Sequence, residues 1–336
     1  MRVEALAILL LATLATPAIA RAADDPNLLH ADRGTLKLSW RGNEADIGRA
    51  GLVEWIQRSA GIVSRFYGEF PLEQVDIQVS LGEGDRVTGG RTFGAPDAVI
   101  ELRVGRHVSA QALHDDWVLV HEMIHLALPE VSDEQNWLAE GLATYVEGIA
   151  RTQAGNMSAT ALWSEYFTDM TKGLPGAGDQ GLDRTHTWAR TYWGGALFFL
   201  VADVRIHEQT RNTRGLQDSL WAIERAAGGM AERWPAARIF AVGDQATGTK
   251  VLQDLYAAMK DKPWAPDLAA LWADLGVGAD NGGIRLDETA RLSAVRRAMT
   301  APYCSARSVS TTAVRQPSSA SSIAVASDSC APSPSQ

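Results

Sequence analysis

A histidine pair, His121 and His125, with Glu122 directly after the first histidine, constrains this chain more than any other feature of its sequence. Histidines four residues apart lie on the same face of an α-helix and can bind one zinc ion. Glu122 is then placed to take a proton from a water bound to that zinc. The pattern therefore predicts a helix that carries a hydrolytic zinc site.

Flanking residues bound the helix that carries this pair. Ser109 is suited to cap its N-terminus and Pro129 cannot continue it, so we expect one helix over residues 110–128. Its apolar stripe is expected to face the core and consists of Trp117, Val120, Ile124 and Leu128.

Glu140, which Gly141 follows, is the candidate for a third zinc ligand. A third histidine is excluded, because the positions at which one branch of zinc-binding proteins carries a glycine and a histidine are Leu128 and Val131 here. Three protein ligands leave the fourth zinc position open for water, as a catalytic site requires.

A second helix is expected over residues 132–148, because Ser132 and Gln135 form a capping-box pattern. A helical wheel leaves two alternatives for Glu140 on this helix. It could be a solvated glutamate, since it lies opposite an apolar stripe, or it could face the metal, since the small side chains beside it would admit another helix. The stripe consists of Leu138, Leu142, Tyr145 and Ile149, and the small residues are Ala143 and Thr144.

His114 is excluded as a ligand although it lies on the same helix face as His121. Seven residues of helix separate the two by about 10 Å along the axis. A zinc–nitrogen bond of about 2.1 Å cannot span that distance.

Periodicity predicts an α+β chain. Alternating residues indicate three strands and a helical pattern indicates one helix before residue 108, while glycines 82, 84, 89, 90 and 94 indicate loops. The strands are expected at 36–40, 75–79 and 98–104, and the helix at 50–66. Later helices are expected at 158–172, 188–208, 214–228, 246–260 and 266–276. We therefore expect a small sheet up to about residue 108, packed on the metal-site helix, and a mostly helical part over 109–300.

Two motifs resemble the gluzincins, and within them the bacterial peptidase-MA-like relatives of thermolysin and the membrane aminopeptidases. They are the helix with His121, Glu122 and His125, and the segment 137–147, which runs Trp-Leu-Ala-Glu-Gly-Leu-Ala-Thr-Tyr-Val-Glu. The run Tyr-Trp-Gly-Gly-Ala that begins at Tyr192 is similar to the Tyr-x-x-Gly-Ala start of a helix in the aminopeptidases.

The resemblance implies a zincin-like fold, bound Zn2+ and a peptide or protein substrate. It implies His121, His125 and Glu140 as zinc ligands, with Tyr192 stabilising the oxyanion of the intermediate. It also implies that Glu147 contacts one of the zinc-bound histidines on the side of its ring away from the metal.

The resemblance also implies that an edge strand before the metal helix pairs with the substrate backbone. Residues 94–104 take that place here, and 94–98 read Gly-Ala-Pro-Asp-Ala. The glutamate with which aminopeptidases hold the free amine of the substrate is missing from this stretch. An endopeptidase is therefore favoured over an exopeptidase.

The N-terminus resembles an export signal. Residues 1–22 combine Arg2, an apolar run and Ala18-Ile19-Ala20, which is typical of a cleavage site, so a periplasmic or secreted protein is expected. No stretch is apolar over about 18 residues, so no stable membrane span is expected. The formal charge of −9 argues against nucleic acid as a partner.

The C-terminal segment 301–336 is predicted to be a disordered tail. Residues 303–336 contain eleven serines and three prolines. The two cysteines of the chain, Cys304 and Cys330, both lie there, and in an oxidising compartment they could form a disulfide.

These features together predict an exported zinc metallopeptidase with one catalytic domain over residues 23–300. Two alternatives stay open. One is a zinc amidohydrolase that acts on cell-wall peptide cross-links, and the other is a non-catalytic binding protein with the same fold.

Overall fold

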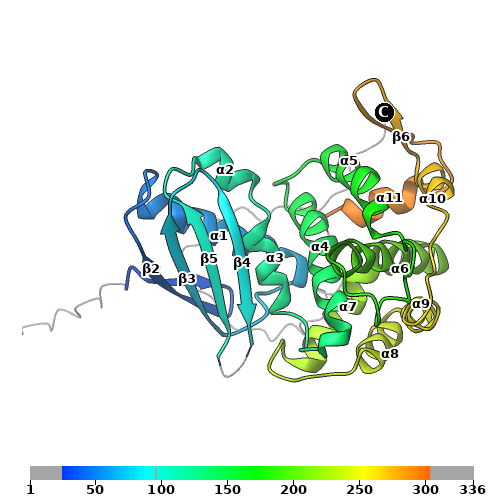
Figure 1. Cartoon of the computed structure of the whole chain (residues 1–336), viewed down its shortest axis with the longest axis horizontal. Coiled ribbons are helices and arrows are strands. Elements are labelled where there is room, and N and C mark those ends of the chain that lie inside the picture. Colours follow the sequence, from blue (N-terminus) through cyan, green and yellow to red (C-terminus); the bar gives the residue numbers. More distant parts are fainter. Residues whose placement is uncertain (1–24, 95–96, 303–336) are drawn as a thin grey trace, which may run out of the picture.

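The computed structural model describes residues 25–94 and 97–302, and they form a sheet-containing part and a helical part. Figure 1 shows the sheet on one side of the molecule and most helices on the other, with helix α3 (Val118–His125) between them. The expected signal peptide, most of the expected tail and both cysteines lie outside the described residues.

The N-terminal sheet has five strands in the order β1-β2-β3-β5-β4. Strands β2, β3 and β5 are parallel, and β1 and β4 are antiparallel to their neighbours. Helix α1 (Gly48–Tyr67) buries one face in the core that it shares with the sheet and α3. The strand bounds are Leu28–Ala31, Gly34–Arg41, Gln74–Gly82, Val87–Phe93 and Val99–Gly105 for β1 to β5.

The edge of this sheet differs from the prediction. Strand β4 (Val87–Phe93) is the edge next to α3, whereas β5 lies inside the sheet between β3 and β4. Glycines at 89 and 90 predicted a loop, yet they belong to β4, in which the pairing with β5 shifts register between Val87 and Gly89. Residues 94–104 are therefore not the edge strand.

The expected helix over 110–128 is two helices, α2 (Ala110–Asp115) and α3 (Val118–His125). The backbone of Asp116 is extended, and its carboxylate accepts hydrogen bonds from Leu119 N and Trp55 Nε1, both at 3.2 Å. Asp116 thus begins a new helix in the way an N-cap residue does. The break turns Trp117 out of the predicted core stripe, and it is 50% exposed.

Helix α4 (Asn136–Gln153) follows the 3-10 turn η1 (Asp133–Gln135). The predicted capping box is wrong, because the Ser132 side chain makes no cap hydrogen bond. Gln135 instead donates to the Tyr256 hydroxyl and accepts from Ala236 N, so it joins the start of α4 to later helices.

Helices that follow α4 surround it and form the rest of the core. Periodicity predicted most of them but missed α8, α11 and the hairpin β6–β7. Their bounds are α5 Ala159–Asp169, η2 Met170–Gly173, η3 Arg190–Gly194, α6 Gly195–Thr210, α7 Leu216–Ala227, α8 Ala236–Thr247, α9 Val251–Met259, α10 Leu268–Leu275, β6 Val277–Asp280, β7 Gly283–Leu286 and α11 Ser293–Thr300.

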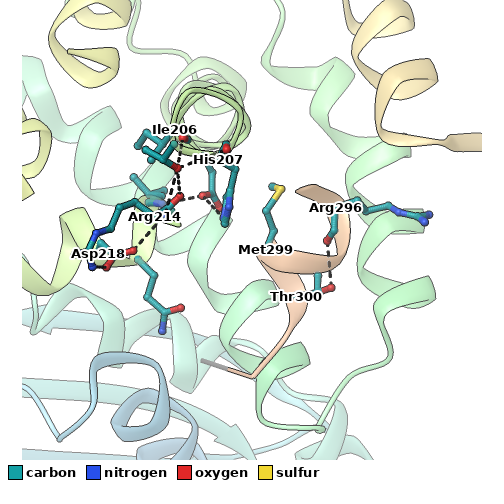
Figure 2. Close-up of polar contacts among 12 residues, drawn as sticks. Ile206, His207, Arg214, Asp218, Arg296, Met299 and Thr300 are labelled. Carbon is teal, nitrogen blue, oxygen red and sulfur yellow. Dashed lines mark hydrogen bonds and ion pairs between the residues drawn. The ribbon is translucent and has the colours of Figure 1, made fainter. Parts of the chain in front are cut away.

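The last helix packs back onto the middle of the chain. Figure 2 shows α11 beside α6 and the start of α7, with His207 and Met299 facing the space between them. Gln153 of α4 donates to Gln217 Oε1 and to the carbonyl of Met299, each at 3.2 Å. Helix α11 is thereby held against α4 and α6. No helix among residues 25–94 and 97–302 has the length and apolar composition of a membrane span.

Candidate functional site

Helices α3 and α4 bring the three predicted ligands together. Nε2 of His121 and Nε2 of His125 lie 3.2 and 3.6 Å from Oε2 of Glu140. One ligand atom from each residue lies within 4.8 Å of the others. Among the described residues this is the only group of at least three such side chains that could hold a metal ion.

The spacing of these atoms fits a zinc ion. Zinc bonds of about 2.1 Å in a tetrahedron place the ligand atoms roughly 3.4 Å apart. The two measured separations, 3.2 and 3.6 Å, lie on either side of that value. Two imidazoles and one carboxylate are also a donor set typical of catalytic zinc.

Electrostatics keep two of the three ligands, His121 and Glu140, in the form that binds a cation. Burial lowers the pKa of His121, which favours the neutral imidazole that a metal needs. Burial acts to raise the pKa of Glu140, but its hydrogen bonds to His121 and His125 outweigh this and lower the pKa, so the carboxylate stays ionised. Burial acts to lower the pKa of His125, but its hydrogen bond to Glu140 and the charges of Glu140 and Glu122 outweigh this and raise the pKa.

A close helix crossing turns Glu140 toward α3. A Cβ on Gly141 would lie 2.2 Å from the Cα of Gly195, so only glycine allows α4 and the start of α6 to approach this closely. With α6 on one side and α3 on the other, α4 is covered on both faces. The Glu140 side chain is only 20% exposed, which excludes the alternative of a fully solvated glutamate.

Strand β4 holds Glu122 in place. The Thr92 hydroxyl lies 2.7 Å from Oε2 of Glu122 and 2.9 Å from its carbonyl, and it can donate to either acceptor. A Cβ on Gly90 would lie 2.5 Å from Cγ of Glu122, so this glycine makes room for the carboxylate. These contacts could not be predicted from the sequence, because they join residues about thirty positions apart that share no local pattern.

Tyr192 lies in the π-helical turn η3 and reaches the same group. Its ring stacks on that of His121 with the centroids 6.2 Å apart. Burial, together with the nearby Glu140 carboxylate, raises the pKa of Tyr192 to about 12. Next to it, Arg190 anchors the turn through a buried ion pair of 2.7 Å with Asp179. π-turns of this kind are frequent at functional sites.

Glu147 and His114 lie away from the three ligands. The Glu147 carboxylate contacts Arg151 Nη1 at 3.3 Å, and no hydrogen bond joins it to either histidine in the described part of the chain. Burial raises the pKa of Glu147 to about 8. His114 is half exposed on α2, where it contacts Asp115.

A cleft of about 870 Å3 opens over these residues. One side is strand β4, including Arg91 and Phe93, and the floor carries the ligand group and Glu122. The exposed rings of Trp117 and Trp188 also line the cleft, together with Tyr192. The volume is sufficient for several residues of an extended peptide.

Two solved structures are similar to this chain in fold. The chain is similar to an aminopeptidase N family protein from Idiomarina loihiensis, with a TM-score of 0.57 and 15% identity over 74% of this chain and 49% of that one. It is also similar to an M1 zinc metallopeptidase from Deinococcus radiodurans, with a TM-score of 0.45 and 13% identity over 71% and 52% of the two chains. No protein-family model matches the sequence, and no curated protein matches it.

The first of these likenesses confirms the predicted α+β, zincin-like fold. The chain spans about half the length of the structures it matches. At this level of identity the likeness concerns the fold, and the chemistry has to be argued from the residues in the cleft.

Proposed function

We propose that this chain is a zinc metallopeptidase whose ion is held by His121, His125 and Glu140. The observation that carries the proposal is the convergence of these three side chains beside Glu122 in an open cleft, in a fold shared with an aminopeptidase N family protein. Zinc bound there would polarise a substrate carbonyl and acidify a nearby water.

Glu122 acts as the general base and then as the general acid. Thr92 holds Oε2 of the carboxylate, which leaves Oε1 to accept a proton from the attacking water. Glu122 passes this proton to the leaving amine. Its buried position keeps bulk water from competing for the proton.

Tyr192 stabilises the charge that develops on the carbonyl oxygen. With its pKa raised to about 12, the phenol keeps its proton at neutral pH and can donate a hydrogen bond. Its stacking on His121 sets the ring beside the ligand group.

The proposed substrate is an internal bond of a peptide or protein. One matched structure is named as an aminopeptidase N family protein, which would favour removal of N-terminal residues. However, an enzyme of that kind needs an anionic group for the free amine of the substrate, and β4, the edge strand, reads Val-Thr-Gly-Gly-Arg-Thr-Phe without any acidic residue. Cleavage of peptides with a blocked N-terminus would support the endopeptidase, and strict dependence on a free amine would support the aminopeptidase.

We also propose that the protein is exported, because residues 1–22 resemble an export signal. A periplasmic or secreted peptidase would meet extracytoplasmic proteins as substrates. Fractionation of cells that express the full chain, with N-terminal sequencing of the mature protein, tests both the compartment and the cleavage position.

Replacement of the base tests the mechanism. Glu122→Gln should bind zinc as the wild type does and lose at least about 100-fold in the rate of casein or peptide cleavage. Glu140→Ala should lose zinc as well as activity, and His114→Ala should keep both. Cleavage by Glu122→Gln at the wild-type rate would show that the mechanism is wrong.

A further inference from the structure

Two tryptophans beside the candidate zinc group are exposed although their rings are large and apolar. Among the described residues only three large hydrophobic side chains are exposed, namely Leu28, Trp117 and Trp188. Both tryptophans line the cleft that contains the ligand group. Six of the other tryptophans are buried, so the fold readily covers this residue type elsewhere.

The two rings form part of a continuous aromatic wall. Trp117 meets His121 edge to face at 5.6 Å, His121 stacks on Tyr192 at 6.2 Å, and Tyr192 stacks on Trp188 at 5.7 Å. We call these four rings, Trp117, His121, Tyr192 and Trp188, the aromatic wall. Trp117 therefore contacts a proposed zinc ligand, His121, and Trp188 contacts Tyr192, which we propose to stabilise the oxyanion.

Local structure, rather than chance, presents the tryptophans to the cleft. Trp117 lies at the break between α2 and α3, which the half-buried carboxylate of Asp116 fixes through its hydrogen bond to Leu119 N. Trp188 lies one helical turn before Tyr192, and the adjacent η3 turn is anchored by Arg190 and Asp179. Rings held in fixed positions bind a ligand with little loss of conformational entropy.

Charge does not set the preference of this cleft, because its lining carries acidic side chains, among them Glu130 and Asp133, as well as Arg91. Strand β4 adds the ring of Phe93, on which the Arg91 guanidinium stacks 4.9 Å from the ring centroid. A large apolar side chain in the cleft would cover the exposed tryptophan rings.

We infer that the aromatic wall is a specificity subsite for a large apolar side chain, aromatic above all, next to the scissile bond. This inference rests on the proposed peptidase function. It adds that Trp117 and Trp188 select the substrate and take no part in the chemistry. Burial of an aromatic side chain against one such ring should raise the specificity constant roughly tenfold over alanine.

Blocked five-residue alanine peptides with phenylalanine, alanine or lysine at the centre provide the test. For the wild type, kcat/KM should fall about tenfold or more from phenylalanine to alanine, and phenylalanine should also be preferred over lysine. In Trp117→Ala or Trp188→Ala the preference for phenylalanine, taken as the ratio of kcat/KM for the phenylalanine and alanine peptides, should shrink. Trp264→Ala, at a half-buried tryptophan that lines no part of the cleft, is the matched control and should keep the preference.

A binding measurement separates this inference from the function on which it rests. Calorimetric titration of zinc-loaded Glu122→Gln with the same peptides should show tighter binding of the phenylalanine peptide, lost in the double variants that also carry Trp117→Ala or Trp188→Ala. Cleavage by the wild type without preference, or preference unchanged in both tryptophan variants, would overturn the subsite and leave the peptidase standing. If no peptide is cleaved but the phenylalanine peptide binds, the peptidase proposal fails instead. Tryptophan-dependent binding of a tetramer of N-acetylglucosamine, with no binding of the phenylalanine peptide, would assign the wall to a glycan and overturn the inference.

Discussion

At the residue scale, the proposed base is held by a strand that is remote from it in sequence. The Thr92 hydroxyl contacts one carboxylate oxygen of Glu122, and Gly90 leaves room for its methylene groups. Glu122 is only 7% exposed, so without Thr92 its carboxylate would have few other hydrogen-bond donors nearby. Thr92 is therefore a positioning residue, which acts on the substrate only through Glu122.

Replacement of Thr92 should slow catalysis without weakening substrate binding. A hydrogen bond to a charged group contributes on the order of 1.5–3 kcal/mol, so Thr92→Val, which keeps the side-chain volume, should lower kcat roughly tenfold or more with little change in KM. Thr92→Ser keeps the hydroxyl and should restore most of the rate. Steady-state kinetics on one blocked peptide measure both constants. Equal rates for Thr92→Val and the wild type would mean that the bond does not orient the base.

The raised pKa of Glu147 predicts how the stability of the fold depends on pH. Its pKa is raised by burial from 4.5 to about 8, so between these pH values the folded state holds a proton that the unfolded state has lost. The free energy of unfolding should therefore fall as the pH rises through this window. Glu147→Gln cannot titrate, and the part of the decline that Glu147 causes should disappear.

Urea unfolding between about pH 5 and pH 8 measures this slope. Each unit of pKa difference corresponds to about 1.4 kcal/mol. Between pH 5 and pH 8, the free energy of unfolding of the wild type should therefore fall by more than about 1 kcal/mol relative to that of Glu147→Gln. Glu54→Gln, at an exposed position of α1, is the control and should keep the wild-type slope. Parallel curves for Glu147→Gln and the wild type would contradict the raised pKa.

At the scale of elements, the crossing of α4 with the start of α6 aligns two parts of the site. Glu140 precedes the glycine on α4 at which the two backbones touch, and Tyr192 comes three residues before Gly195 on the other side. A side chain at this crossing would separate the backbones and move both functional groups.

Substitution of Gly141 should therefore cost stability as well as metal affinity. Its added methyl group would meet the Gly195 Cα at 2.2 Å, and overpacking of this kind costs about 1–3 kcal/mol. Gly61→Ala in α1 is the matched control, because a Cβ there meets nothing within 4 Å and alanine favours helix by up to about 1 kcal/mol. Urea unfolding and zinc content report the two effects. Gly141→Ala with wild-type stability would show that the helices can separate freely.

Element by element, the sequence predicted what periodicity controls. Strands β2, β3 and β5 and helices α1 and α4 have regular apolar patterns, and the structure confirms them. It did not predict β4, because glycines at 89 and 90 have low strand propensity, and Gly90 is required there to leave room for Glu122. It also did not predict the break before α3, because Asp116 is stabilised there by Trp55 from a distant helix.

The candidate site was more predictable than the fold around it. Ligand spacing on a helix is a local property, so His121, Glu122 and His125 could be read directly from the sequence. Glu140 and Tyr192 needed a family resemblance, since a helical wheel alone left Glu140 ambiguous. Thr92 and the exposed faces of Trp117 and Trp188 depend on tertiary contacts and on a helix break, for which the sequence offers no signal.

At the scale of the whole molecule, the candidate metal group lies where the two parts of the chain meet. Helix α3 packs on the sheet and α1, whereas α4 packs on the helical part. Elsewhere this boundary is joined by polar contacts of α7, in which Gln217 and Trp221 donate to the carbonyl of Phe66 at 2.6 Å and Glu224 pairs with Arg33 at 2.8 Å. Zinc would add a further link, between α3 and α4.

Zinc should therefore stabilise the whole fold, because its ligands come together only when both helices are in place. A ligand that binds the folded state alone at 100 times its Kd adds about 2.7 kcal/mol to the free energy of unfolding. For a chain of this size, we expect the Tm to fall by roughly 5–10 °C when a chelator removes the metal, and to recover when zinc is restored. Glu122→Gln and His114→Ala should respond as the wild type does, whereas His121→Ala and Glu140→Ala should unfold at the same temperature with and without zinc. If the chelator leaves the wild-type Tm unchanged and the protein contains no zinc, the three side chains do not form a metal site, and the peptidase proposal falls with it.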